Sequence, residues 1–312
     1  MESVKLSNTN LDITRLGFGC GPLGGTDWGQ FDEDESMAAV LKAIDLGVTF
    51  FDTADIYGLG CSERLLSKAL GQRRHDVIIA TKFGVNWENS PNGNRAKTFY
   101  DSSPERVVEA LENSLRRLRI DTIPLYFIHW PDPDTPLSDT IEALARCQES
   151  GKIQHIGVSN FSPDQIRETS ERISLAAVQM QYSLIDRRVE KELIPCCQEL
   201  GISVITYGPL AQGLLTGKYE MDAQFGLDDC RSRLAHFKGE DFERKLEIVN
   251  RLREMEKCYN KLSTQIAIRW VLDNPAISCV ISGIKSPAQI EQNAGAVGWN
   301  LTSEDYEYLV NG

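Results

Sequence analysis

Short β-rich runs alternate regularly with longer amphipathic segments along this chain, and this alternation limits the folds that it can adopt. Eight runs carry the apolar and β-branched residues that are typical of buried strands. They are Leu16 to Cys20, Val48 to Phe51, Val77 to Thr81, Leu125 to Ile128, Ile153 to Val158, Ala177 to Gln179, Val204 to Thr206 and Cys279 to Ser282. Because no Pro/Gly/Ser-rich linker divides the 312 residues, this α/β pattern predicts one (β/α)8 TIM barrel, a single domain over residues 1–312.

The segments between the strands have helical periodicity and helix-boundary residues. Met37 and Val40 recur at helical spacing, and Gly47 stands where a helix C-terminal glycine belongs. Ser103 followed by Pro104 is typical of an N-cap and a first helical residue. An open dinucleotide-binding sheet is the weaker alternative, because the glycines of "GFGCGPLGG" are followed by "TDWGQ" rather than by a helix.

Several residues are expected to have structural roles at the N-terminal side of the barrel or in its helices. The stretch "VKLSNTNLDI" predicts an N-terminal β-hairpin that turns at residues 7–10 and caps the bottom of the barrel. His75 and His155 precede or begin strands and are expected on this same side. His236 lies in an acidic insert, residues 220–243, and is expected to be solvated, whereas Cys196 and Cys197 are expected to be small buried hydrophobes.

Composition excludes several classes of function. A formal charge of −12 without a basic run argues against a nucleic-acid surface. No apolar run reaches the length of a membrane span and no secretory leader is present, so we expect a cytoplasmic protein that does not bind membranes. The eight cysteines are scattered without a C-x-x-C pair, so we expect reduced thiols and no metal site. Oligomeric state is left open.

Four chemically active side chains are expected at one rim of the barrel, because the active sites of this fold lie where the strands' C-terminal ends enter their loops. Strand two ends at Asp52 with Tyr57 in the following loop "DTADIYG". Strand three ends at Lys82 in "IIATKFG", and strand four ends at His129 in "YFIHWP". One acid, one phenol, one amine and one imidazole would therefore converge.

This set of groups suits the reduction of a carbonyl. A tyrosine with a pKa of about 10 is a weak acid, and we expect the ammonium of Lys82, held by Asp52, to lower the pKa of Tyr57. A neutral His129 could donate an N–H to the carbonyl oxygen and polarise it. No serine or cysteine lies beside a base in this set, so a hydride from a reduced cofactor is the economical nucleophile.

The remaining rim residues suit a nicotinamide dinucleotide. Ser159, Asn160 and Gln179 offer hydroxyl and amide groups to a carboxamide, and Tyr207 offers a ring to stack on it. After the last strand, Ser286 and Pro287 predict a helix N-terminus beside Lys285, which is an anion site.

Taken in order, the motifs "DTADIYG", "ATKFG", "FIHWP", "GVSNF", "VQMQYSL", "YGPLAQGLLTGKY" and "SPAQIEQN" resemble those of the aldo-keto reductases over nearly the whole chain. The motifs "QYS" and "LLTGKY" are most similar to those of bacterial-type general reductases and of the potassium-channel β-subunit-like branch. The resemblance implies an NADP(H)-dependent carbonyl reductase with a catalytic tetrad of Asp52, Tyr57, Lys82 and His129. The coenzyme residues expected from it are Cys20, Gly21, Asp52, Ser159, Asn160, Gln179, Tyr207, Gly208, Pro209, Leu210, Gln212, Gly213, Lys218, Gly283, Lys285, Gln289 and Asn293.

This chain departs from the family pattern at two of these positions. Gly208 replaces a frequent serine, which removes a hydrogen bond to a pyrophosphate. Gln289 stands where arginine is frequent, which leaves Lys285 as the main candidate cation for a 2′-phosphate.

Substrate contacts are expected from Tyr57, His129 and three tryptophans, Trp28, Trp87 and Trp130. The long loop over residues 83–103 is rich in amides and hydroxyls, which suits a small hydroxylated carbonyl such as a sugar or polyol derivative. Two alternatives stay open: a nicotinamide-binding regulatory subunit with incidental turnover, and a Schiff-base lyase using Lys82, for which a protonated lysine is a poor nucleophile.

Overall fold

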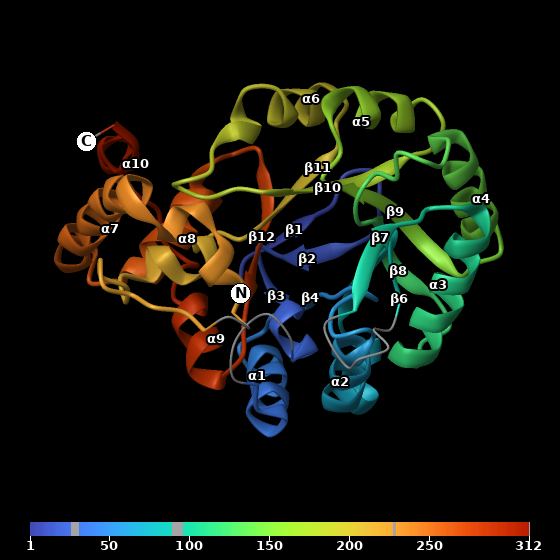
Figure 1. Cartoon of the computed structure of the whole chain (residues 1–312), viewed down its shortest axis with the longest axis horizontal. Helices are drawn as coiled ribbons and strands as arrows, with labels where there is room; N and C mark the ends of the chain where they lie inside the picture. Colours follow the sequence, from blue (N-terminus) through green and yellow to red (C-terminus); the bar gives the residue numbers. More distant parts are fainter. Residues whose placement is uncertain (26–30, 89–95, 227–228, 312) are drawn as a thin grey trace.

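A computed structural model describes residues 1–25, 31–88, 96–226 and 229–311, and its centre is a closed barrel of eight parallel strands (Figure 1). Around the barrel the strands follow the order β10-β11-β12-β3-β4-β5-β8-β9. In chain order they are β3 Leu16–Gly19, β4 Phe50–Asp52, β5 Ile78–Phe83, β8 Ile123–Ile128, β9 Ile153–Ser159, β10 Leu175–Gln181, β11 Ser203–Tyr207 and β12 Ile277–Gly283. The predicted (β/α)8 barrel and all eight predicted strands are confirmed.

Strand ends differ from the predicted ones by a few residues, and pairing explains the largest change. β10 extends two residues beyond the predicted run at each end, because it is hydrogen-bonded to β9 on one side and β11 on the other. A strand paired on both sides gains hydrogen bonds over its whole length, including at polar residues that its sequence pattern leaves out.

Helices lie outside the barrel and cover the strands (Figure 1). They are α1 Glu33–Asp45, α2 Cys61–Leu70, α3 Pro104–Leu118, α4 Leu137–Glu149, α5 Pro163–Ser170, α6 Leu193–Glu199, α7 Gly239–Tyr259, α8 Ser263–Asp273, α9 Pro287–Ala294 and α10 Ser303–Asn311. The expected boundary residues are confirmed: Ser103 caps α3 by accepting from the backbone of Arg106, and Gly47 has the positive φ of 81° that favours glycine just after α1.

The apolar core has an outer layer between the strands and helices and a smaller inner layer inside the barrel. Phe127 occupies the inner layer beside Gly157 of the neighbouring strand, where an added Cβ would lie only 2.4 Å from the phenylalanine ring. The interior therefore requires a glycine at that position.

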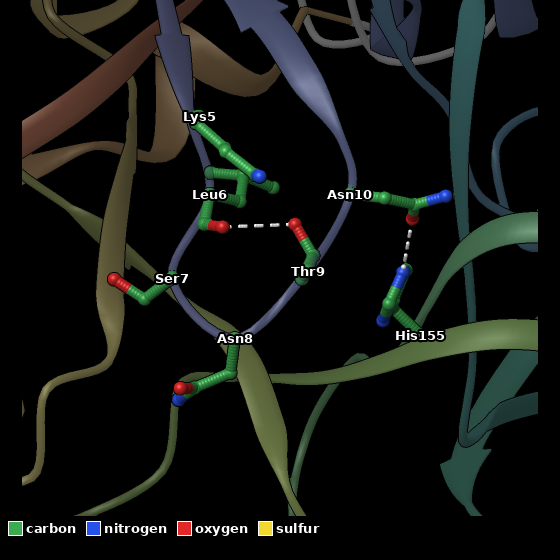
Figure 2. Close-up of a pocket in the computed structure, with 7 residues that line it drawn as sticks. All are labelled: Lys5, Leu6, Ser7, Asn8, Thr9, Asn10 and His155. Atoms are coloured by element: carbon green, nitrogen blue, oxygen red, sulfur yellow. Dashed lines mark hydrogen bonds between the residues drawn. The ribbon is translucent and has the colours of Figure 1, made fainter.

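The N-terminal hairpin closes the bottom of the barrel, as predicted. Strands β1 Ser3–Lys5 and β2 Asp12–Thr14 pair antiparallel, and Leu6, Leu11 and Ile13 join the inner layer of the core. Figure 2 shows the turn, where the Thr9 hydroxyl donates to the Leu6 carbonyl over 2.9 Å. His155 lies 2.9 Å from Asn10 through its Nε2 atom (Figure 2), which is the structural role expected of it.

The segment after β5, predicted only as a long loop, contains a second hairpin. Strands β6 Val85–Glu88 and β7 Lys97–Tyr100 pair antiparallel, with Trp87 opposite Thr98. Aromatic and β-branched residues favour such a pair. The two strands were not predicted because they are short and lie outside the strand–helix repeat of the barrel.

The expectation that His236 is solvated is wrong. It lies half-buried in a short 3-10 segment, Ala235–Phe237, and its ring centroid is 4.8 Å from that of Phe237. Burial lowers the pKa of His236, and aromatic packing around Phe237 outweighs the acidic composition of the insert. Cys196 and Cys197 are buried as expected, and no helix in the described ranges is long and apolar enough to cross a bilayer.

Candidate active site

Asp52 and Lys82 lie on adjacent strands and form a buried ion pair at the C-terminal end of the barrel. Lys82 Nζ donates to Asp52 Oδ2 at 2.6 Å and to the backbone carbonyl of Thr53 at 2.8 Å. The lysine side chain is 0% exposed and the aspartate side chain 5%. The hydroxyl of Tyr57, in the turn after β4, lies 3.5 Å from the same Nζ. Three of the expected catalytic groups are therefore in contact.

Lys82 keeps its charge in this buried position. Burial alone opposes the ammonium form, but the charge of Asp52 and the contact with Tyr57 outweigh it and raise the pKa of Lys82. This finding disfavours the Schiff-base reading, because an amine nucleophile must be unprotonated.

The expectation that Lys82 lowers the pKa of Tyr57 describes only part of the balance. Burial is the larger effect and raises the pKa of Tyr57, while the nearby ammonium of Lys82 opposes it. The net direction is upward, since a phenolate in a desolvated site loses more hydration than one lysine returns. Tyr57 is therefore a proton donor rather than a base at neutral pH.

His129 faces the ring of Tyr57. The ring centroids are 5.7 Å apart with planes at 83°, and the imidazole Nδ1 is buried with no hydrogen-bond partner among the described residues. Burial, and next the charge of Lys82, hold the pKa of His129 well below its usual range. A neutral imidazole can present an N–H to an oxygen held beside the Tyr57 hydroxyl.

The residues expected on the nicotinamide form one hydrogen-bonded row across β9, β10 and β11. Gln179 Nε2 donates to Asp52 Oδ1 at 2.8 Å, which joins this row to the ion pair. Asn160 donates to the Ser159 hydroxyl at 3.0 Å and to the His129 carbonyl at 2.9 Å, and it accepts from the Tyr207 hydroxyl at 2.7 Å. Asn160 also has a positive φ of 62°. Such a strained, interlocked row is typical of a ligand site.

The loop after β11 has an unusual backbone. Gly208 and Gly213 have positive φ, and so do the non-glycine residues Ala211 and Gln212, at 46° and 53°. The side-chain Oε1 of Gln212 is buried without a partner among the described residues. The backbone N–H groups of Ala211 and Gly213 donate to the carbonyls of Gly208 and Leu210 at 3.0 and 2.9 Å, which holds the loop in this conformation. Glycines at positive φ let a backbone approach a ligand closely, which suits a phosphate. Within this loop Pro209 is buried, and Leu210 packs against the apolar core.

A cluster of three cations lies beyond that loop. Arg231 pairs with Asp229 and contacts the Tyr219 hydroxyl. Burial, and next the charge of Arg231, lower the pKa of both Lys218 and Lys285. A lysine whose pKa is lowered by burial and by a neighbouring cation is stabilised in its charged form by an anion, so this cluster fits a phosphate group. Sequence reasoning missed Arg231, and its only signal was a basic "RSR" within an acidic insert.

Lys285 also stands at the start of α9, as predicted. Ser286 caps this helix by accepting from the backbone of Gln289. Gln289 Oε1 accepts from the Lys285 backbone N–H at 2.8 Å, and Asn293 donates to the Ser282 hydroxyl at 3.0 Å. Gln289 and Asn293 thus brace the loop that carries Lys285, and Gly283 is exposed at the end of β12.

Two of the expected coenzyme residues lie at the end of β3. Burial raises the pKa of the Cys20 thiol well above its usual value, so the thiol stays protonated, while the Cys20 backbone N–H donates to the Asp52 carbonyl at 2.8 Å. Gly21 faces Tyr57, because a Cβ added there would be 3.8 Å from its ring.

The expected substrate residues are only partly brought together. Trp130 is 38% exposed and its ring centroid lies 6.3 Å from that of Tyr100. Trp87 lies on β6 with the guanidinium of Arg106 over its ring. Trp28 lies outside the described residues. In the described ranges, no group of three His, Cys, Asp or Glu side chains could hold a metal ion.

Comparisons with known proteins identify the family of the chain. The model of the aldo/keto reductase family matches residues 15–311. The aldo-keto reductase YhdN of Bacillus subtilis (strain 168) is 37% identical over 308 residues, covering 98% of this chain and 91% of that protein. The NADH-specific methylglyoxal reductase of Escherichia coli (strain K12) is 32% identical over 316 residues, covering 98% of this chain and 96% of that protein.

A solved structure has the same architecture. The glycerol dehydrogenase AKR11B4 from Gluconobacter oxydans superposes with a TM-score of 0.91 at 34% identity, covering 98% of this chain and 93% of that one. The chain therefore belongs to the aldo/keto reductase family of oxidoreductases.

Proposed function

We propose that this protein reduces an aldehyde or ketone to an alcohol with NADPH, and that Tyr57 is the general acid. The observation that carries the proposal is the contact between the Tyr57 hydroxyl and the buried, charged Lys82, beside a neutral His129. The positive-φ loop and the cation cluster fit the phosphates of a dinucleotide.

Each residue of the catalytic set has a separate role in the proposed reduction. When bound, the reduced nicotinamide supplies the hydride. His129 holds the carbonyl oxygen near Tyr57 and polarises the carbonyl by hydrogen bonding. Tyr57 then donates its proton to that oxygen as negative charge develops. Lys82, kept charged by Asp52, stabilises the phenolate that remains until a proton returns from solvent.

The preference for NADPH rests on the cations around Asp229. Among the described residues, Lys218, Arg231 and Lys285 lie close enough to lower the pKa of both lysines, and a 2′-phosphate would add a favourable negative charge there. The related Escherichia coli enzyme is NADH-specific by name, so the family alone does not select the coenzyme.

We further propose a small hydroxylated carbonyl as the substrate. In the described part of the segment after β5, Asn86 donates to Asp101 at 2.9 Å, and the Ser103 hydroxyl donates to the same carboxylate at 2.7 Å. Such amide, carboxylate and hydroxyl groups suit a hydroxylated substrate. The name of the structural neighbour, glycerol dehydrogenase, points to the same chemical class.

The test follows NADPH absorbance with a panel of carbonyls that runs from glyceraldehyde-like to apolar aromatic aldehydes. We expect turnover with the panel and the highest kcat/KM for the hydroxylated members. NADPH binding without turnover of any carbonyl would instead support the regulatory subunit. Higher kcat/KM for the apolar members would overturn the substrate proposal alone.

A further inference from the structure

Asp55, two residues before Tyr57, forms a buried ion pair that its surroundings only partly satisfy. Its Oδ2 accepts from Arg106 Nη2 at 3.0 Å, and the two side chains are 0% and 7% exposed. Asp55 Oδ1 and Arg106 Nε are buried without a hydrogen-bond partner among the described residues. Burying two charges costs free energy, and polar atoms without hydrogen bonds do not offset that cost. A contribution to folding stability alone therefore does not explain why this pair is present.

The same guanidinium also holds the second hairpin. Its central carbon lies 5.3 Å from the centroid of the Trp87 ring, a cation–π distance. Trp87 follows Lys82 by five residues, on the strand that continues from β5. The backbone N–H of Asp55, in turn, donates to the Lys82 carbonyl at 3.2 Å. One side chain, Arg106, therefore bridges the turn that carries Tyr57 and the strand that carries Trp87.

We infer that Arg106 is a positioning residue: by pairing with Asp55 and lying over Trp87, it fixes the Trp87 ring, an expected substrate contact, relative to the Tyr57 hydroxyl and so positions the carbonyl substrate. This inference rests on the proposed carbonyl reduction. Within the described ranges the side chain of Arg106 contacts Asp55, Glu109 and Trp87 and none of the expected coenzyme residues, so coenzyme affinity should not depend on it.

The charge of Asp55, and with it the pairing to Arg106, should depend on pH near neutrality. The charged or titratable groups that face Asp55 are Glu63 on α2, Arg106 and Arg117 on α3, and Tyr126 on β8. Burial, and next the charge of Glu63, raise the pKa of Asp55 to about 7 against the two arginines. Protonation of Asp55 below that pH removes the charge that holds Arg106 in place. The contact with Trp87 should then loosen, and the substrate KM should rise.

The first experiment compares full-length wild type with Arg106→Lys, Trp87→Leu and the double variant. Lysine keeps a charge near Asp55 but lacks a plane that can cover an indole ring while it pairs. We expect Arg106→Lys to raise the substrate KM about tenfold with NADPH affinity unchanged, because small misplacements of a substrate are costly. The double variant should be no worse than the poorer single variant, since both changes break one contact.

The matched control is Glu109→Gln. Glu109 also pairs with Arg106, at 3.3 Å, but its side chain is 65% exposed, so its loss should leave KM unchanged. The inference is overturned if Arg106→Lys has the wild-type KM. It is also overturned if the KM of the double variant rises by the product of the increases in the two single variants. Should Arg106→Lys fail to fold, Trp87→Leu decides, because a wild-type KM in that variant contradicts a seating role for Trp87.

A second readout does not need turnover. The difference in tryptophan emission between wild type and Trp87→Phe reports the Trp87 environment, and we expect it to titrate with a midpoint near 7, the pKa of Asp55. Asp55→Asn should remove that titration. If wild type reduces no carbonyl, the proposed function fails while this titration still decides the inference. An emission that is pH-independent in wild type, or unchanged by Asp55→Asn, overturns it.

Discussion

The Nζ atom of Lys82 lies 2.6 Å from Oδ2 of Asp52, and the two side chains are removed from water. This relationship keeps an ammonium beside the Tyr57 hydroxyl in a site where burial alone would neutralise it. It links a structural requirement, a paired charge inside a barrel, to a chemical one, a proton donor with a nearby stabilising cation.

Tyr57→Phe should abolish carbonyl reduction and leave NADPH binding intact, because the phenol donates a proton but carries none of the phosphate contacts. General acid catalysis is typically worth a factor of roughly 10² to 10⁴, so kcat should fall at least that far. Stopped-flow turnover and fluorescence titration of NADPH measure the two effects. A variant that retains more than about a tenth of kcat would exclude Tyr57 as the donor.

Lys82→Met should lose activity and also stability. The substitution leaves Asp52 buried without its cation, which typically costs roughly 3 to 5 kcal/mol in the free energy of unfolding. Urea unfolding measures this loss. The double variant Asp52→Asn/Lys82→Met is the control and should recover part of it, because no unpaired charge remains.

Residual activity of Lys82→Met should have a shifted pH profile. The charge of Lys82 lowers the pKa of Tyr57 against burial, so its removal raises that pKa further. Tyr57 must be protonated to act, and the alkaline fall in kcat should therefore move to higher pH. A profile identical to that of wild type would show that Lys82 does not act on Tyr57.

Lys285→Glu should weaken NADPH binding and spare NADH. The change replaces attraction by repulsion at the cation cluster, and the loss should equal or exceed a charge-assisted hydrogen bond of roughly 1.5 to 3 kcal/mol. Fluorescence titration of both coenzymes at two salt concentrations measures it, because screening should reduce the difference. The control is Lys5→Glu, which makes the same charge change at the exposed bottom hairpin (Figure 2). Equal loss of NADH and NADPH would contradict the 2′-phosphate assignment.

Asp55→Asn should change how stability depends on pH. The pKa of Asp55 is about 7 in the folded protein and about 3.9 in an unfolded chain, so the folded state binds more protons between those values. This residue's contribution to the free energy of unfolding therefore falls as pH rises from about 4 to about 7. Asparagine removes this contribution. The free energy of unfolding of wild type minus that of the variant should therefore decrease as pH rises over that window.

Urea unfolding at several pH values tests this prediction. The exposed Asp121→Asn serves as the control, because it makes the same substitution at a surface position away from the Asp55–Arg106 pair. Wild type and Asp55→Asn that keep a constant difference between about pH 4 and about pH 7 would contradict the raised pKa.

The linear pattern of residues predicts the barrel, the order of its strands along the chain and the polar residues where the strands end. Apolar periodicity and helix-boundary residues such as Ser103 and Gly47 act within a few residues, so a linear pattern reveals them. The positions of Asp52, Lys82 and His129 follow from the same pattern, because parallel strands deliver their C-terminal ends to one rim.

The balance of charges in the site depends on the three-dimensional arrangement and could not be predicted from the linear pattern. Whether the pKa of Tyr57 rises or falls depends on burial by distant segments, which outweighs the neighbouring lysine. Asp55 and Arg106 are 51 residues apart in the sequence but hydrogen-bonded in the structure. Arg231, in the acidic insert, lies close enough to Lys285 to lower its pKa. Desolvation and Coulomb energies depend on distance in space, so sequence patterns that act locally do not predict them.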